Sequence, residues 1–433
     1  MEWRNWAGLE MAHPDVVIHP GDTQAVVGAV DRARNDGTTV KMVGTGHSFT
    51  GIGTPGHTML RPDRLSGIVA VDRDAMTVTA LAGTPLRVLN LELERLGLSL
   101  HNMGDIADQT LAGAISTGTH GTGGVTSGLS AQVAGLQLVT GTGEVLTATA
   151  SENADVLDLA RIGLGALGVL TTVTFRVEPV FLLEAHEQPM TWDQALGSFD
   201  ELASANHHLD LYWFPHTDRV LAKQNNRLDA PPEEAEHQSR GRAWFEDELL
   251  ANRAFGLLCA GANRAPGVIP RMNRATSRLL TERRYSGVAH RVFTSHRRVV
   301  FKEMEYAVPR AAGPDALREA RRAIERSDWR ISFPVEVRVA PQDDVPLSTA
   351  YRRDIVYLAF HTHRDADHEE YFAAIERIMR EHDGRPHWGK LHSLGAADLV
   401  EDYPRFRDFL ALRDRLDPDR VFANDHLRRL LGD

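Results

Sequence analysis

The 433-residue sequence contains a single cysteine, Cys259. One cysteine cannot form a disulfide within the chain, which is typical of proteins from reducing compartments. No apolar run approaches the roughly 18 residues that a membrane-spanning helix needs. The N-terminal stretch MEWRNWAGLEMAHPDVV is interrupted by charged residues and lacks a signal-peptide pattern. We therefore expect a cytoplasmic protein with no membrane span.

An excess of basic residues is also missing. The chain has 48 Lys and Arg against 59 Asp and Glu, a net charge of −11. Nucleic-acid binding is therefore not expected, because no surplus of cations is available to neutralise phosphates. The apolar share of 42% and the charged share of 25% are ordinary for a globular protein with a core. The length predicts about two or three domains.

Residues 15–180 are rich in Gly, Thr, Val and Ala, and short β-type runs alternate there with helical patterns. One helix is predicted to begin at Asp22 or Thr23, which can cap it, and to end at Gly37. The stretch LQLVTGTGEVLTAT reads as a β-hairpin. A purely parallel dinucleotide-binding fold contains few hairpins, so the pattern favours an α+β fold.

Residues 181–415 contain more Arg, Glu, His and aromatic side chains. PDALREARRAIERSDW and HEEYFAAIERIMREH are predicted helices, and PVEVRVA and DIVYLAFHTH are predicted strands. RLDAPPEEAEHQSRGR is predicted to be an exposed loop. The pattern indicates a second α+β domain, followed by a short C-terminal segment, residues 416–433.

A glycine-rich motif, VGTGHSFTG, occupies residues 43–51. A Gly-Thr-Gly run after a strand exposes successive N–H groups that can hold phosphate oxygens. Gly44 and Gly46 are followed by Phe49 rather than a third glycine, so the dinucleotide fingerprint fails. The stretch does not match the Walker phosphate-binding loop or the G-x-S-x-G nucleophile elbow either. By itself the motif leaves open whether His47 is structural or functional.

A second stretch, NMGDIADQTLAGAISTGTHGTG at residues 102–123, is also dense in Gly, Ser and Thr. Glycines allow a backbone to approach a flat or anionic ligand closely, and hydroxyls supply hydrogen-bond donors. Two such loops in one domain indicate a large polyphosphate cofactor.

Four motifs occur in order: VGTGHSF, AGAISTGTHGTG, LGALGVLTTVTF and RPHWGKLH. Together they resemble the vanillyl-alcohol-oxidase (PCMH-type) superfamily of FAD-linked oxidoreductases. Within it the chain resembles the aldonolactone oxidases, which act on L-gulono-1,4-lactone or D-arabinono-1,4-lactone, close to the alditol oxidases. The resemblance implies a two-domain α+β fold. Residues 1–180 would bind FAD, residues 181–415 would form a substrate-binding cap with an antiparallel sheet flanked by helices, and residues 416–433 would return to the FAD domain.

The resemblance also implies how FAD is held. In this family the histidine of the G-x-G-H-S motif, here His47, carries the flavin covalently through its 8α-methyl group. The alternative is non-covalent FAD with His47 merely packing. The motifs assign cofactor binding to Gly44, Thr45, Gly46, His47, Ser48, Gly104, Asp105, Gly113, Ser116, Thr117, Gly118, His120, Gly121, Gly168, Val169 and His387.

Catalytic residues are expected in the second domain. Glu336 and Arg338 lie two apart on a predicted strand, so their side chains share a face. Burying two charged side chains on an apolar strand is costly unless they form an ion pair or take part in function. A purely structural ion pair is the alternative to a catalytic role. By resemblance, this pair and Lys390 line the sugar pocket, and His361 occupies a polar position on the neighbouring strand.

A metal site built from histidines is the other possibility for this region. His361, His363, His387 and His392 lie within a short stretch, but no carboxylate stands at a convincing spacing. We expect no metal.

The resemblance implies oxidation of a secondary alcohol, the C2 hydroxyl of a sugar lactone, by hydride transfer to flavin N5. Arg338 and Lys390 would orient the substrate and stabilise the reduced flavin, and either Glu336 or His361 would take the proton. Gly104, at a position that gates oxygen in relatives, predicts reoxidation by O2 with release of H2O2, unless it serves only a turn.

Three alternatives stay open. One is an alditol oxidase acting on xylitol or sorbitol, and another is a lactone dehydrogenase with a quinone or cytochrome acceptor. A flavin-fold sensor, scaffold or hydrolase fits poorly with a Glu-Arg-Lys set.

Overall fold

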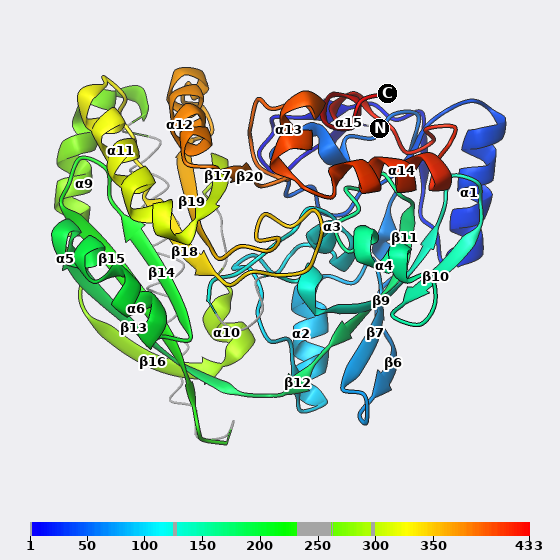
Figure 1. Ribbon diagram of the computed structural model, residues 1–433, viewed down its shortest axis with the longest axis horizontal. Coiled ribbons are helices and arrows are strands. Elements are labelled where there is room, and N and C mark those ends of the chain that lie inside the picture. Colours follow the sequence, from blue (N-terminus) through cyan, green and yellow to red (C-terminus); the bar gives the residue numbers. More distant parts are fainter. Residues whose placement is uncertain (1, 124–127, 232–260, 262, 296–298) are drawn as a thin grey trace.

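The computed structural model describes residues 2–123, 128–231, 261, 263–295 and 299–433. The chain forms two units, each built around β-sheet and covered by helices (Figure 1). Within these residues, no helix combines the length and apolar character needed to cross a membrane. The structure agrees with the predicted α+β class and with a second domain containing a large antiparallel sheet.

The first unit contains a five-stranded antiparallel sheet, in the order β10-β9-β11-β7-β6, and a three-stranded parallel sheet, in the order β3-β5-β4. Its strands are β1 (Trp3–Arg4), β2 (Met11–Ala12), β3 (Val16–Ile18), β4 (Val40–Met42), β5 (Thr58–Leu60), β6 (Ile68–Asp72), β7 (Thr77–Leu81), β8 (Leu98–Ser99), β9 (Val133–Val139), β10 (Val145–Thr149), β11 (Val169–Arg176) and β12 (Glu178–Pro179). Its helices are α1 (Thr23–Asn35), α2 (Leu86–Arg95), α3 (Leu111–Ser116) and α4 (Ala154–Ala160).

Helix α1 shows how local sequence sets an element. Asp22 caps it by accepting a hydrogen bond from the backbone N–H of Ala25, at 2.8 Å. Gly37, with φ of +63°, follows the C-terminus in a left-handed conformation that glycine adopts freely. The predicted start and end are both confirmed. One face of the helix is apolar and buried, formed by Val26, Ala29, Val30 and Ala33.

The second unit contains an eight-stranded antiparallel sheet in the order β16-β13-β15-β14-β18-β19-β17-β20. Helices α11 and α12 pack against each other and against its strands β17 and β19. The strands are β13 (Leu182–Thr191), β14 (His208–Trp213), β15 (Arg219–Leu228), β16 (Arg283–Val288), β17 (Phe301–Pro309), β18 (Val335–Ala340), β19 (Ile355–His363) and β20 (Arg385–Pro386). The helices are α5 (Trp192–Gly197), α6 (Phe199–Ala205), α9 (Ile269–Ser277), α10 (Ala289–Phe293), α11 (Gly313–Arg326) and α12 (Glu369–Glu381).

The C-terminal part of the chain packs on the first unit. Its helices are α13 (Ala396–Asp402), α14 (Phe406–Leu416) and α15 (Asp425–Leu431). Leu399, Phe409 and Leu430 join the apolar core beneath the five-stranded sheet. The backbone N–H of Val40 donates to the carbonyl of Val421 at 2.9 Å, which ties the segment to β4. Leu399 shows that α13, which precedes residue 416, already contributes to this core.

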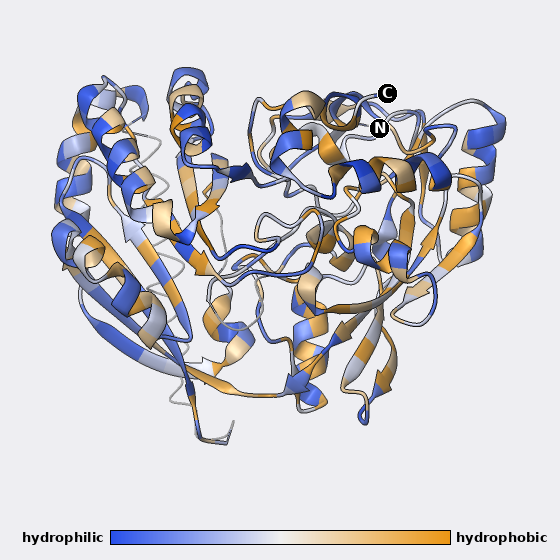
Figure 2. Ribbon diagram, in the orientation of Figure 1, coloured by the Kyte–Doolittle hydropathy of each residue, from blue (hydrophilic) through white to orange (hydrophobic). Residues whose placement is uncertain are grey.

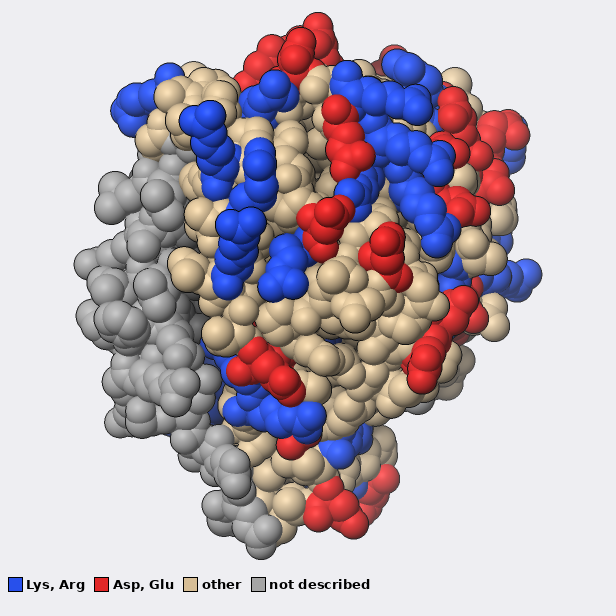
Figure 3. All heavy atoms as spheres, turned by 90° about the vertical axis from the view of Figure 1, so that its left-hand side faces the viewer, with Lys and Arg blue, Asp and Glu red and all other residues tan. Residues whose placement is uncertain are grey.

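The distribution of apolar residues matches the packing of the helices on the sheets. Apolar residues concentrate on the strands and on the helix faces turned toward them, while the outer helix faces are hydrophilic (Figure 2). The face that the second unit presents in Figure 3 carries both signs of charge. Within α11, Arg318 forms an ion pair with Asp315. Most of the predicted loop RLDAPPEEAEHQSRGR, from residue 232 onward, lies outside the described residues, and so does Cys259.

Candidate active site

The loop after β4 is shaped by its glycines. Gly46 has φ of +72°, a left-handed conformation that favours glycine. A side chain at Gly44 would collide with the hydroxyl of Thr110, which caps α3. The loop therefore packs closely on α3, and the two glycine-rich motifs of the sequence meet.

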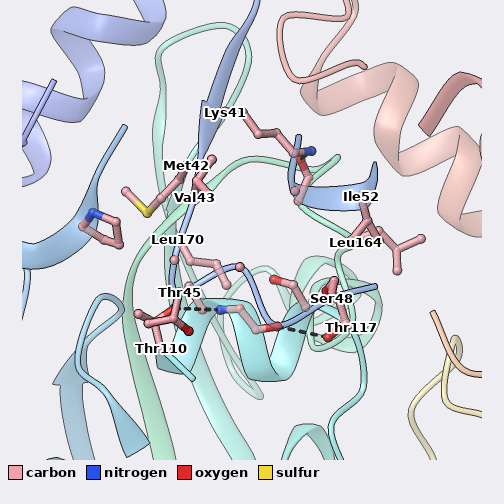
Figure 4. A pocket seen from close by; sticks show the side chains of 18 of the residues that line it. Lys41, Met42, Val43, Thr45, Ser48, Ile52, Thr110, Thr117, Leu164 and Leu170 are labelled. Carbon is pink, nitrogen blue, oxygen red and sulfur yellow. Dashed lines mark hydrogen bonds between the residues drawn. The ribbon is translucent and has the colours of Figure 1, made fainter. Parts of the chain in front are cut away.

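An elongated cavity of about 120 Å³ lies between these motifs. Figure 4 shows Thr45, Ser48, Thr110 and Thr117 gathered on one side and Lys41 on the other. A backbone cradle with four hydroxyls and a cation fits the pyrophosphate of a dinucleotide. The sequence-predicted cofactor residues that line the cavity are Gly44, Thr45, Gly46, His47, Ser48, Gly113, Ser116, Thr117, Gly168 and Val169.

Lys41, on β4, is a buried cation of this cavity that the sequence analysis missed. Its side chain is 5% exposed, and Nζ donates to the carbonyls of Gly165 at 3.0 Å and Phe422 at 3.3 Å. Burial lowers the pKa of Lys41 to about 7, although Asp417 opposes the shift. A buried ammonium held by two neutral carbonyls favours an anionic ligand.

His47 lies at the junction of two cavities, since it lines both this one and a second. Its ring stacks on Trp6, with centroids 5.8 Å apart and planes at 29°. The Nδ1 atom is buried and has no hydrogen-bond partner within the described part of the chain. Burial lowers the pKa of His47, so the imidazole is neutral near pH 7. A neutral imidazole with an uncommitted nitrogen is a competent nucleophile.

The second cavity, of about 60 Å³, lies where loops of the first unit meet β17 and β18 of the second. Aromatic and backbone groups and several charged side chains share its wall. The sequence-predicted residues that line it are His47, Ser48, Gly104, Asp105, Thr117, His120, Arg338, His387 and Lys390.

Lys390 lines this cavity and forms an ion pair with Glu303 of β17. Burial alone would lower the pKa of Lys390, but Glu303 and Glu305 outweigh it and raise that pKa. Nε2 of His361 lies 3.5 Å from Glu303, and its Nδ1 donates to the carbonyl of Pro334 at 3.0 Å. His361 is not part of the described cavity lining, and Glu303 links it to Lys390, which is.

A second carboxylate of β17, Glu305, lines the cavity itself. Nε2 of His120 lies 3.2 Å from Glu305, Nδ1 of His120 donates to the carbonyl of Gly121 at 3.0 Å, and the ring stacks on Tyr357 at 3.4 Å. Both ring nitrogens of His120 therefore face oxygen acceptors, which fix the orientation of the ring. Burial by itself raises the pKa of Glu305, but His120 outweighs it and holds the pKa well below its usual range.

His120, Glu305 and His387 are close enough together to be considered as metal ligands. The backbone N–H of Gly389 donates to Nδ1 of His387 at 3.0 Å, and burial lowers the pKa of His387 to about 3. Nδ1 of His387 thus already accepts a hydrogen bond from the backbone. His361, His363 and His392 do not join such a group within the described residues.

Arg338 of β18 is surrounded by carboxylates. It lies 2.7 Å from Glu336, 2.9 Å from Asp210 and 3.8 Å from Asp105. Burial alone would lower the pKa of Arg338, but these three carboxylates raise it well above its usual value. The guanidinium also lines the cavity, whereas Glu336 does not belong to its described lining. The predicted common face of Glu336 and Arg338 is present, and their ion pair is the observed contact.

Gly104 leaves little room for a side chain. A Cβ there would lie 3.0 Å from the carbonyl oxygen of His120 and 3.1 Å from Cγ2 of Thr119. The residue lines the cavity beside these groups. Its φ lies outside the left-handed region, so close approach rather than backbone strain distinguishes this glycine.

Four predicted residues lie apart from the two cavity walls described above. Glu336 pairs with Arg338, and His361 is linked to Lys390 through Glu303. Gly118 occupies a turn with φ of +74° against Ile162, and Gly121 packs so closely on Asn102 and the carbonyl of Met103 that a side chain there would collide with them.

The sequence analysis missed Glu303 and Glu305. Their spacing of two on the strand FKEMEYAVP is the same signal that singled out Glu336 and Arg338. Asp210 gave no such signal, because it reaches Arg338 only through the pairing of β14 with β18.

Two family models match the sequence. The model described as D-arabinono-1,4-lactone oxidase matches residues 173–430, and a model described as FAD binding domain matches residues 14–149.

Similar proteins match nearly the whole chain. L-gulono-1,4-lactone dehydrogenase of Mycobacterium tuberculosis is 40% identical over 430 residues, which cover 99% of each chain. L-gulonolactone oxidase of Bos taurus is 31% identical over 437 residues, covering 99% of this chain and 98% of that protein. The solved structure of cholesterol oxidase from B. sterolicum superposes with a TM-score of 0.84 and 19% identity, covering 99% of this chain and 96% of that one. At that identity the likeness concerns the fold alone.

Proposed function

The chain belongs to the D-arabinono-1,4-lactone oxidase family of FAD-dependent oxidoreductases, and on that basis we propose that it oxidises the C2 hydroxyl of an aldono-1,4-lactone to a ketone. L-gulono-1,4-lactone is the proposed substrate, because two similar proteins carry that lactone in their names. The observation that carries the proposal is one cavity in which His47, Arg338 and Lys390 meet.

The cofactor is FAD, and we propose that His47 bonds to its 8α-methyl group. The support is the buried, neutral imidazole with an uncommitted Nδ1 at the junction of the two cavities. Bound FAD supplies the hydride acceptor at N5 and passes its electrons on to O2, giving H2O2.

Charged side chains of the protein would bind and orient the substrate. Arg338 and Lys390 are held in place by carboxylates behind them and present cations to the cavity, which suits binding of substrate hydroxyls and stabilisation of developing negative charge. Glu336 and His361, the two proton acceptors expected from the sequence, lie behind the described lining: Glu336 pairs with Arg338, and His361 is linked to Lys390 through Glu303. Glu305, which lines the cavity, is a third candidate acceptor.

Oxygen is the proposed electron acceptor because Gly104 carries no side chain at the cavity wall. The second candidate is a dehydrogenase that uses a quinone or cytochrome. The dehydrogenase name of the relative that is 40% identical favours it.

The substrate is tested by steady-state assays of the purified holoenzyme with L-gulono-1,4-lactone, xylitol and sorbitol side by side. The lactone is expected to give the highest kcat/KM, by at least about tenfold, since the pocket would be built for its ring. Higher kcat/KM with either alditol would replace the lactone assignment by an alditol oxidase.

A further inference from the structure

A third cavity, of about 50 Å³, adjoins the one that holds His47 and Lys390. The two cavities share Asp105 and Arg338 in their walls. The rest of its wall comes from both units and includes the polar side chains of Asp210, Lys223 and Asn225 on the second. Asp210 already has a place in the proposed function, because it holds Arg338. Lys223 and Asn225 were not singled out by the sequence, and the proposed chemistry does not use them.

Asn225 lies on β15, 1% exposed, and its Oδ1 is buried without a hydrogen-bond partner among the described residues. A buried amide oxygen left unpaired is costly, and native structures rarely keep one without a reason. Because Asn225 lines the cavity, a donor entering the cavity would satisfy this oxygen.

Lys223 lies two residues earlier on the same strand and lines the same cavity. Its Nζ donates to the carbonyl of Val292 at 3.0 Å and contacts the hydroxyl of Tyr285. An ammonium carries three N–H groups, so one donor remains. Burial alone would lower the pKa of Lys223, but Tyr285, Asp210 and Glu187 raise it, so the side chain is charged.

The cavity thus offers an acceptor at Asn225, a donor at Lys223 and further carboxylates. That mixture suits a ligand whose groups both donate and accept, as hydroxyls do, and it suits an apolar ligand poorly. A volume of about 50 Å³ corresponds to about three or four water molecules on the same measure. The side chain of a six-carbon aldono-1,4-lactone, –CHOH–CH2OH, is of that size and chemistry.

We propose that this cavity is a specificity subsite that binds the hydroxylated side chain of an aldonolactone while the lactone ring lies beside Arg338. Asn225 accepts a hydrogen bond from a side-chain hydroxyl, and Lys223 donates one. The subsite rests on the proposed lactone oxidation and adds to it: lactones with a dihydroxyethyl side chain are preferred over lactones that lack it.

The test compares Asn225→Ala with wild-type holoenzyme on L-gulono-1,4-lactone and on L-threono-1,4-lactone, which has the ring but no side chain. For the variant, KM for the gulonolactone should rise about tenfold or more with kcat within about threefold, because binding away from the reacting carbon is lost. Constants for the threonolactone should change less than about twofold. Where it is not turned over, its inhibition constant against gulonolactone serves instead.

Asn226→Ala is the matched control, because Asn226 is the next residue on β15 and its side chain bonds to Asn206 and the backbone of His207. Lys223→Met is the second variant, used if Asn225→Ala loses flavin or fails to fold. Equal effects on both lactones, or none, would overturn the subsite while leaving the lactone activity standing. A wild-type enzyme that no lactone reduces would overturn the proposed function and the subsite with it.

Discussion

At the scale of single residues, Arg338 and Lys390 place two cations beside one cavity, each backed by carboxylates. Replacing either by Ala should lower the rate of flavin reduction by lactone at least about 100-fold, because each supports charge in a site shielded from water. Stopped-flow reduction under anaerobic conditions measures this rate. Bound flavin should be retained.

Lys302→Ala is the control for Lys390, since Lys302 lies on β17 and its Nζ donates to the carbonyl of Ala366. This variant should reduce its flavin at the wild-type rate. If Arg338→Ala and Lys390→Ala also stayed within about threefold of wild type, their ion pairs would be purely structural.

Gly104 bears on the electron acceptor. Gly104→Ala would place a methyl group 3.0 Å from the carbonyl oxygen of His120, inside the cavity wall. Reoxidation of the reduced flavin by aerated buffer should slow at least about tenfold, while reduction by lactone changes little, since only the path for oxygen is narrowed. Rapid mixing of anaerobically reduced enzyme with aerated buffer follows the reaction. A wild-type flavin that stays reduced in air but is quickly oxidised by a quinone identifies a dehydrogenase.

How far single residues can be predicted depends on the range of their contacts. Glu336 and Arg338 could be identified because side chains two residues apart on a strand lie on the same face of the sheet. Glu303 and Glu305 carry the same signal and were overlooked. Asp210 could not be found in this way, because its contact with Arg338 depends on which strands become neighbours. The loop motifs contain most of the residues that line the cavity proposed to hold FAD. Nothing in the sequence indicated that Lys41 lines it too, because a single lysine on a short strand is usually exposed.

At the scale of elements, the loop after β4 holds His47 in a fixed place. Its backbone is anchored by Trp6, whose N–H donates to the carbonyl of Gly46 at 2.8 Å, and by Phe49, whose N–H donates to Gly389 at 2.8 Å. We predict that acid-precipitated wild-type protein keeps its yellow colour in the pellet, and that His47→Ala releases the flavin. Wild-type flavin recovered wholly in the supernatant would mean a non-covalent cofactor.

The buried position of Lys41 on β4 predicts that FAD binding depends on pH. Burial lowers the pKa of Lys41 to about 7 in the ligand-free protein, and a bound pyrophosphate would raise it. FAD binding then takes up a proton above pH 7. Affinity should be full below pH 7 and fall by up to about tenfold per unit as pH rises through the pKa of the free protein.

Titration of His47→Ala with FAD between pH 6 and 9 measures this dependence without the covalent link. The double variant His47→Ala, Lys41→Met should bind more weakly and with a flatter pH profile. A dissociation constant that does not change with pH in His47→Ala would show that Lys41 only tethers Gly165 and Phe422.

Helices and strands whose apolar residues recur with a clear period could be predicted from the sequence. The hairpin β9–β10, the strands β18 and β19 and the helices α1, α11 and α12 all occur where the pattern placed them. Strands of two residues, such as β1 and β20, carry no period that a sequence can show, because their pairing depends on segments far away in the chain.

At the scale of the whole molecule, the proposed active site belongs to neither unit alone. The first unit supplies the loops proposed to hold FAD, and β17 and β18 of the second supply the charged side chains Glu305 and Arg338. The C-terminal segment is hydrogen-bonded to the chain that follows the His47 loop: Nδ2 of Asn424 donates to the carbonyls of Gly51 at 3.0 Å and Thr54 at 2.9 Å. The resemblance predicts that residues 416–433 return to the FAD domain, and that boundary stays a prediction.

The central claim is that this assembled site oxidises an aldonolactone with FAD. The most direct measurement is anaerobic titration of the purified holoenzyme with L-gulono-1,4-lactone while the flavin absorption bands are followed. The account predicts complete bleaching of the oxidised bands, with one molecule of ketone product formed per flavin reduced. A flavin that stays oxidised with the lactone, or a protein with no flavin bands, would contradict it.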